Sequence, residues 1–214
     1  MQLKVVMALT GAVMLAYLVV HMLGNLKIFF GEQALNTYAH WLRLIGEPAL
    51  PGEGMLWIIR VVLLAAVAAH IWAAVSLWRQ AKRARPQGYV TKKAVAQSYA
   101  SRTMRWGGVI IIAFVVFHIL DLTLGAVNKE GHDGTPFDRM LASFENPFVV
   151  AFYAISVILV GMHLRHGIWS ATQTLGQSNR RREVTVNYAA TAIATVLTLG
   201  FLLTPFSVLF GLID

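Results

Sequence analysis

Five apolar runs, separated by polar stretches, constrain this chain most strongly. They cover roughly residues 5–26, 56–78, 106–128, 147–170 and 187–211. Each is close to the length of about 20 residues that a helix needs to cross a bilayer. Only 13% of the 214 residues are charged, whereas soluble domains carry about 25%. We therefore expect an all-α membrane protein, a single-domain bundle of five transmembrane helices over residues 1–214.

The first run begins close to Met1, as a cleaved signal peptide would. A signal peptide has a shorter apolar region that ends at a small-residue cleavage site. This run is longer, and it ends in a lysine and two phenylalanines between residues 27 and 30. We expect it to be retained as the first helix.

The net charge of +8 resides mainly in two of the four connections. Basic loops mark the cytoplasmic side of a membrane protein, so these two are expected in the cytoplasm, with the N-terminus inside and the C-terminus outside. Because the basic residues lie in short loops, we exclude nucleic acid as a partner. The second connection holds Arg79, Lys82, Arg83, Arg85, Lys92, Lys93, Arg102 and Arg105, and the fourth holds Arg165, Arg180, Arg181 and Arg182.

The remaining segments are expected to play structural parts. Residues 31–55 read as an amphipathic segment in the membrane interface, and residues 129–146 read as a solvated turn. The last run has no histidine, and its threonines can bond to their own backbone. We expect it to be a packing helix with a kink at Pro205.

Four runs each carry one histidine in their second half, at His21, His70, His118 and His163. An ionisable side chain at membrane depth is costly and marks a functional site. Successive helices cross in opposite directions, so the second halves of the first and third helices lie at one level. We expect His21 to meet His118 there, and His70 to meet His163 at a level roughly 10–15 Å away, from a rise of 1.5 Å per residue.

Paired neutral imidazoles suit the two axial positions of a haem iron. The sequence therefore predicts two haem b groups, with outer iron ligands His21 and His118 and inner iron ligands His70 and His163. The chain has no cysteine, which excludes covalent CxxCH attachment of haem and iron–sulfur clusters held by cysteines of this chain. The pattern differs from cytochrome b of respiratory complex III, in which two helices each carry two histidines.

Haem propionates require cations or hydrogen-bond donors near the membrane surfaces. The candidate contacts are Arg43 on the outer side and Arg105, Arg165 and His166 on the inner side. His40 and His132 fall in the outer loops, where we expect them to be solvated.

Three stretches together resemble one family. They are Gly-Met-His-Leu-Arg-His-Gly-Ile-Trp-Ser-Ala-Thr-Gln-Thr-Leu-Gly at 161–176, Ser-Arg-Thr-Met-Arg-Trp-Gly-Gly at 101–108 followed by Phe117-His118, and His-Met-Leu-Gly-Asn-Leu at 21–26. They look like the single-chain, five-helix, di-haem cytochrome b anchor of succinate dehydrogenase and fumarate reductase, the menaquinone-linked type. The resemblance extends over the whole chain.

The resemblance implies a subunit of respiratory complex II in the bacterial cytoplasmic membrane, with the same two histidine pairs as haem ligands. It implies two soluble partners on the cytoplasmic side. One is a flavoprotein with covalent FAD that handles succinate and fumarate, a tricarboxylic acid cycle reaction. The other is an iron–sulfur protein that passes electrons to this anchor. The chain itself is then expected to relay electrons and bind quinone without performing succinate chemistry.

The expected quinone residues follow from the same resemblance. In one branch of the family a glutamate between the first two helices serves the distal quinone. Here the matching position is Arg43 and the nearest acid is Glu47, which argues against a site of that type. On the inner side, Arg102, Trp169, Ser170 and Gln173 are candidates to line a quinone pocket, although Gln173 fits a contact to the partner equally well. Asp121 is either an outer proton relay or a helix-end acid that faces water.

Two other functions remain open from the sequence. The first is a cytochrome b subunit of another oxidoreductase, such as a hydrogenase or a formate dehydrogenase, which the stretch at 161–176 disfavours. The second is a haem-free anchor or small transporter, in which the histidines would pack or relay protons. That function predicts no absorbance in the visible range.

Overall fold

The computed structural model describes residues 2–84, 96–176 and 179–213. Five long helices dominate these residues and account for five segments long and apolar enough to cross a membrane, the third of which runs from Trp106 in the fourth-numbered helix to Thr123 beyond its end. The all-helical, five-span prediction is therefore confirmed. The long helices are α1 (Gln2–Asn25), α3 (Gly54–Arg83), α4 (Ala96–His118), α6 (Pro147–Thr174) and α7 (Arg180–Leu209).

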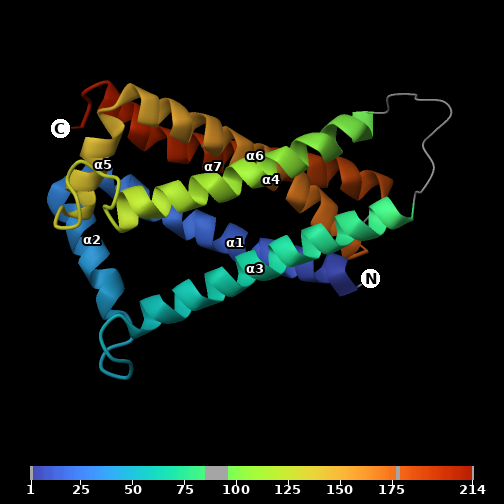
Figure 1. The fold of residues 1–214 in the computed structure, drawn as a ribbon, viewed down its shortest axis with the longest axis horizontal. Helices are drawn as coiled ribbons and strands as arrows, with labels where there is room; N and C mark the ends of the chain where they lie inside the picture. The colour runs from blue at the N-terminus through green and yellow to red at the C-terminus, as the bar shows by residue number, and fades with distance from the viewer. Residues whose placement is uncertain (1, 85–95, 177–178, 214) are drawn as a thin grey trace.

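Four short helical segments complete the fold. A 3₁₀ turn, η1 (Leu26–Phe30), extends α1, and a π-helical turn, η2 (Ile119–Thr123), extends α4. The helices α2 (Glu32–Leu44) and α5 (Pro136–Phe144) lie together at the end of the bundle that also carries the C-terminus, while the N-terminus lies at the other end (Figure 1). We call these the α2/α5 end and the N-terminal end.

The long helices pack unevenly. The closest packing joins α6 to α7 and α1 to α3, while α4 packs on α6 and α1 also contacts α6 and α7. In Figure 1, α3 accordingly lies apart from the group formed by α4, α6 and α7, with α1 running between them. Asparagine caps start two of these helices. The side chain of Asn146 accepts from the Phe148 amide before α6, and that of Asn179 accepts from the Arg182 amide before α7, satisfying donors that have no partner within the helix.

The expected helix ends required correction at the polar boundaries. The third span ends at Thr123 and not near residue 128, because the chain turns at Gly125 with φ +67. A side chain at Gly125 would collide with the carbonyl of Gly131. Elsewhere the helices run past the apolar runs, with α4 starting at Ala96 and α7 at Arg180. Hydropathy marks only the part of a helix that crosses hydrocarbon, so it misses such extensions.

The segment 31–55 contains the helix α2, whose amphipathic character is visible in its burial. Leu35 is buried while Glu32 and His40 are exposed. The predicted amphipathic segment is thus a helix, and it packs against α5.

The prediction of a solvated turn over 129–146 is wrong for its second half, which forms α5. The Thr135 hydroxyl accepts from the Asp138 amide, the Asp138 carboxylate accepts from the Thr135 amide, and Pro136 occupies the first turn. This capping box with an initial proline is a start signal readable in the sequence. The helix was missed because its nine residues are too few to form an apolar run.

The main hydrophobic core lies at the α2/α5 end and joins five elements. It contains Ile28, Leu35, Phe137, Met140, Phe144, Val150, Tyr153 and Val208. Much of the remaining apolar surface of the long helices is exposed, as in Leu64 and Val61 of α3. Such faces suit contact with lipid tails, and the core at one end fixes the helices relative to one another.

The contact between α6 and α7 depends on Gly161. A Cβ placed there would collide with the Thr198 hydroxyl, which is itself bonded to the Ala194 carbonyl at 2.7 Å. Small residues let membrane helices approach closely. We expect Gly161→Ala to cost about 1–3 kcal/mol of stability through overpacking, measured by unfolding the purified protein in detergent.

Gly167 is the matched control in the same helix, because nothing lies within 4 Å of a Cβ built there. Gly167→Ala should be neutral or stabilising, since alanine is favoured over glycine in a helix by about 1 kcal/mol. Equal effects of the two substitutions would show that helix propensity, and not the α6–α7 contact, governs this region.

Candidate functional site

Two histidines from α1 and the end of α4 meet near the α2/α5 end. The ring centroids of His21 and His118 are 5.8 Å apart, with the rings at 85°. The Tyr17 ring stacks on His21 at 5.2 Å, and Phe114 contacts His118 at 5.8 Å. The pair therefore lies among aromatic rings contributed by the helices around it.

The other two histidines, from α3 and α6, form a second pair. The ring centroids of His70 and His163 are 6.2 Å apart. The Thr10 hydroxyl lies 3.0 Å from His70 Nδ1 and donates its hydrogen to the Val6 carbonyl at 2.7 Å. With the Thr10 hydrogen on that carbonyl, Nδ1–H of His70 donates to the Thr10 oxygen and Nε2 keeps a free lone pair. Among the described residues, the buried Nδ1 of His163 has no hydrogen-bond partner.

These are the two pairs expected from the sequence, and their levels can be compared along α1. Thr10, beside His70, and His21 lie on the same helix eleven residues apart. At 1.5 Å per residue this corresponds to about 16 Å along the helix axis. The two pairs thus lie one above the other within the bundle.

Both pairs have a donor set that fits a haem iron. Centroid distances of 5.8 and 6.2 Å are compatible with one metal ion held between two imidazoles, because metal–nitrogen bonds of about 2 Å and the two ring radii add to a similar length. Within the described part of the chain, no group of three or more histidines, cysteines or acids lies close enough to hold an ion. A pair of imidazoles alone leaves four positions of an octahedral iron, which a tetrapyrrole provides.

Among the described residues, the two helices that carry each histidine pair are not closely packed against each other. In the described ranges, the helix pairs α1–α4 and α3–α6 make few close backbone contacts, although each pair of helices shares a histidine pair. Gly11 faces the His70 ring, and a Cβ there would lie 3.7 Å from Cε1. Two glycines follow a paired histidine within four residues in the sequence: Gly24 makes room for the Tyr38 ring, whereas nothing lies within 4 Å of a Cβ built at Gly167.

Asp121 lies beyond His118 in the π-helical turn and is only 3% exposed. Its carboxylate accepts from the Tyr153 hydroxyl at 2.8 Å, the Ser143 hydroxyl at 2.6 Å and the Asn128 amide at 2.9 Å. The alternative of a helix-end acid facing water is therefore wrong. A cavity of about 360 Å³ borders Asp121, Asn128 and Ser143.

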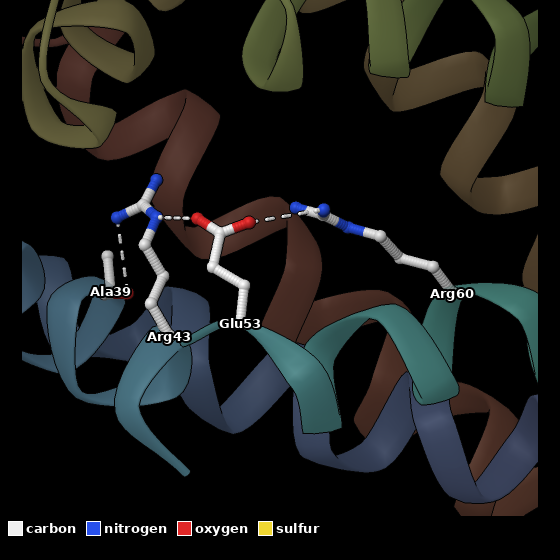
Figure 2. A network of polar contacts seen from close by, with 4 residues as sticks. All are labelled: Ala39, Arg43, Glu53 and Arg60. Atoms are coloured by element: carbon white, nitrogen blue, oxygen red, sulfur yellow. Dashed lines mark hydrogen bonds and ion pairs between the residues drawn. The ribbon is translucent and has the colours of Figure 1, made fainter. Parts of the chain in front are cut away.

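Arg43 is paired with Glu53 at the α2/α5 end. Figure 2 shows the Glu53 carboxylate between two arginines, 3.2 Å from Arg43 Nε and 3.7 Å from Arg60 Nη1. Arg43 also donates to the Ala39 carbonyl at 3.4 Å. The acid beside Arg43 in space is thus Glu53 and not Glu47, and this partly exposed network ties the end of α2 to the start of α3.

Most of the inner-side candidates lie in the second half of α6. Arg165 donates to the Thr191 hydroxyl of α7 at 2.9 Å, and the His166 ring lies 5.8 Å from that of Trp169. Ser170 and Gln173 are partly buried in the same segment. The side chains of Arg102 and Arg105 lie outside the described part of the structure, as do Arg85, Lys92, Lys93 and the side chains of Arg180 and Arg181.

The two loop histidines and the threonines of the last helix agree with expectation, while the kink at Pro205 stays a prediction. His40 and His132 are exposed. In α7 the hydroxyls of Thr191 and Thr198 donate to the carbonyls four residues earlier. The helix continues through Pro205.

Sequence reasoning missed the polar residues that contact the histidines. Thr10 and Tyr153 belong to helices other than those of the histidines they touch. Their distance from these histidines in the sequence follows no pattern that would predict the contact. The same holds for Asn128 and Ser143, which meet Asp121 from a turn and from α5.

Comparison with known proteins identifies the family. A family model described as the succinate dehydrogenase/fumarate reductase transmembrane subunit matches residues 79–202. This range holds His118 and His163 together with α4, α6 and most of α7. Comparisons with curated proteins and with solved structures gave no match. Since the match spans more than half of the chain, the protein belongs to the family of succinate dehydrogenase/fumarate reductase transmembrane subunits.

Proposed function

We propose that this chain is the di-haem cytochrome b anchor of a succinate:quinone oxidoreductase and relays electrons between an iron–sulfur partner and menaquinone. The observation that carries the proposal is the two histidine pairs, at 5.8 and 6.2 Å, inside the transmembrane bundle of a member of this family. Each haem, when bound, supplies a one-electron Fe(III)/Fe(II) couple.

The residues of the chain then hold and orient two such groups. His21 and His118 would hold one group, and His70 and His163 would hold the other. Thr10 keeps the proton of His70 on Nδ1 and so presents Nε2 to the metal, a second-shell role typical of metal-bound histidine. The two histidine pairs are separated by about 16 Å along α1. This separation suits electron transfer from one haem to the other.

The orientation follows from the distribution of basic residues. Basic connections at the N-terminal end support a cytoplasmic position for that end, and we propose that the α2/α5 end is outside the cell. The His70 and His163 pair is then the inner one. We propose that the flavoprotein and the iron–sulfur protein dock on the inner side, near the last turns of α6.

The quinone contacts are proposed on both sides of the bundle. Trp169, Ser170, Gln173 and Arg102 lie near the proposed docking side, and Arg105, Arg165 and His166 are candidates to contact propionates there. On the outer side the cavity beside Asp121 supports its part in a proton relay, and Arg43 remains a candidate propionate contact that already holds Glu53.

The proposal is tested by counting haem in the purified complex. We expect a dithionite-reduced minus oxidised spectrum of b type and a pyridine haemochrome value of two haems per chain. A folded complex with no haem would overturn the proposal and favour the haem-free anchor. Co-purification with a hydrogenase or formate dehydrogenase subunit, in place of a flavoprotein with covalent FAD, would favour the other cytochrome.

A further inference from the structure

The carboxylate of Asp121 is held entirely by hydrogen-bond donors. Ser143 and Asn128 both donate to Oδ1, and the Tyr153 hydroxyl donates to Oδ2. Asn128 Nδ2 also lies 2.8 Å from the Ser143 oxygen and 3.0 Å from the Arg139 carbonyl, so its two hydrogens are shared among three acceptors, and the Ser143 hydroxyl donates to Asp121. Asp121 therefore acts only as an acceptor, and its position is fixed from three directions.

The network continues from Asp121 to one of the paired histidines. The Tyr153 oxygen lies 3.4 Å from Nδ1 of His118. Since the single hydroxyl hydrogen of Tyr153 points to Asp121, Nδ1–H of His118 must be the donor to the Tyr153 oxygen. The proton of His118 is thus held on Nδ1, and Nε2 is free on the side of the ring available to a metal.

This connection distinguishes His118 from the other three paired histidines. His70 bonds a neutral threonine, and Nδ1 of His163 has no partner. The phenol beside His21, that of Tyr17, stacks on the ring without a hydrogen bond to it. In the part of the chain that the structure describes, His118 alone is joined through a hydroxyl to a buried carboxylate.

We propose that Asp121 and Tyr153 are positioning residues for His118 that lower the reduction potential of the iron it ligates. The inference rests on the proposed function, because it requires haem at the His21 and His118 pair. A carboxylate that accepts from Tyr153 makes the phenol oxygen a stronger acceptor toward Nδ1–H. The imidazole then donates more electron density to the iron, which favours Fe(III).

The first test removes the acceptor with Tyr153→Phe. We expect the Fe(III)/Fe(II) ratio of that haem at a fixed ambient potential to fall about tenfold, in line with the effect of second-shell changes. For a one-electron couple this corresponds to a rise of about 59 mV in midpoint potential. An optical redox titration of the purified complex measures the shift, and the haem at His70 and His163 should keep its potential.

Asp121→Asn tests the direction of the hydrogen bonds. The new amide can keep its oxygen toward Ser143 and Asn128 only by turning its NH₂ group toward Tyr153. Tyr153 would then donate to Nδ1 of His118, which opposes the tautomer needed for ligation through Nε2. We expect a shift in the same direction and at least as large as for Tyr153→Phe, with changed EPR g-values for the low-spin haem.

Two control variants separate positioning from general damage. Tyr17→Phe makes the same change beside His21, where no hydrogen bond joins the rings, and should shift the potential less than Tyr153→Phe. Thr10→Val should alter only the haem of the His70 and His163 pair. If Tyr153→Phe or Asp121→Asn fails to fold, Ser143→Ala removes one donor from Asp121 at a distance from the histidines, and a shift confined to the outer haem still supports the proposal.

The failure of this inference is distinct from that of the proposed function. A wild-type complex without haem contradicts both. Two haems in the wild type, with an unchanged potential in Tyr153→Phe and Ser143→Ala or with equal shifts of both haems, would overturn the positioning role alone. Loss of the outer haem in Tyr153→Phe, with the inner haem intact, would support the positioning role.

Discussion

Replacing His21 or His118 with alanine should remove about one of two haems per chain and leave the other with its spectrum intact. Replacing His70 or His163 should remove the complementary haem. Each substitution would remove one of the two histidines that would hold that haem. The pyridine haemochrome assay and low-temperature difference spectra of the purified variants measure the result.

Double variants test the pairing itself. If His21 and His118 hold the same iron, His21→Ala/His118→Ala should lose no more haem than either single change. The combination His21→Ala/His70→Ala should lose both haems. His40→Ala and His132→Ala are matched controls, since both histidines are exposed, and should retain two haems. If haem is lost in other combinations of variants, the histidines form other pairs, and the predicted depths of the two pairs in the bundle are wrong.

The pairing of the histidines in space could be predicted from the sequence because it depends only on span length and helix direction. The length of each span and the alternating direction of successive helices determine the level of each histidine, and small errors in helix ends matter little. His21 and His118 lie together even though α4 begins ten residues before the expected span and ends before residue 128.

The hydrogen-bond partners of the histidines could not be predicted in the same way. A helix that is apolar on all sides gives no amphipathic signal for its rotation about its own axis. That rotation decides whether Thr10 faces His70 and whether Tyr153 faces His118 and Asp121. The sequence could not decide whether Asp121 is a proton relay or an acid that faces water, because the answer depends on which residues cover the end of α4. Ser143 covers it from α5, and α5 was not among the expected helices.

The core at the α2/α5 end is expected to support this network, and Phe144→Ala tests it. Phe144 is 3% exposed, and its ring packs edge-on against Tyr153 at a centroid distance of 5.0 Å. Removing a buried phenylalanine side chain costs about 3–5 kcal/mol, through lost burial and the cavity that remains. We expect a loss of this size in the free energy of unfolding of the purified subunit in detergent.

Phe148→Ala is the control for the same chemical change four residues later, because Phe148 is 84% exposed at the start of α6. It should alter the unfolding free energy by less than about 0.5 kcal/mol. Because Phe144 holds the ring whose hydroxyl joins His118 to Asp121, Phe144→Ala should also shift the potential of the haem at His21 and His118 in the direction of Tyr153→Phe. Destabilisation without that shift would mean that the hydrogen bonds of Asp121 position Tyr153 without support from the core.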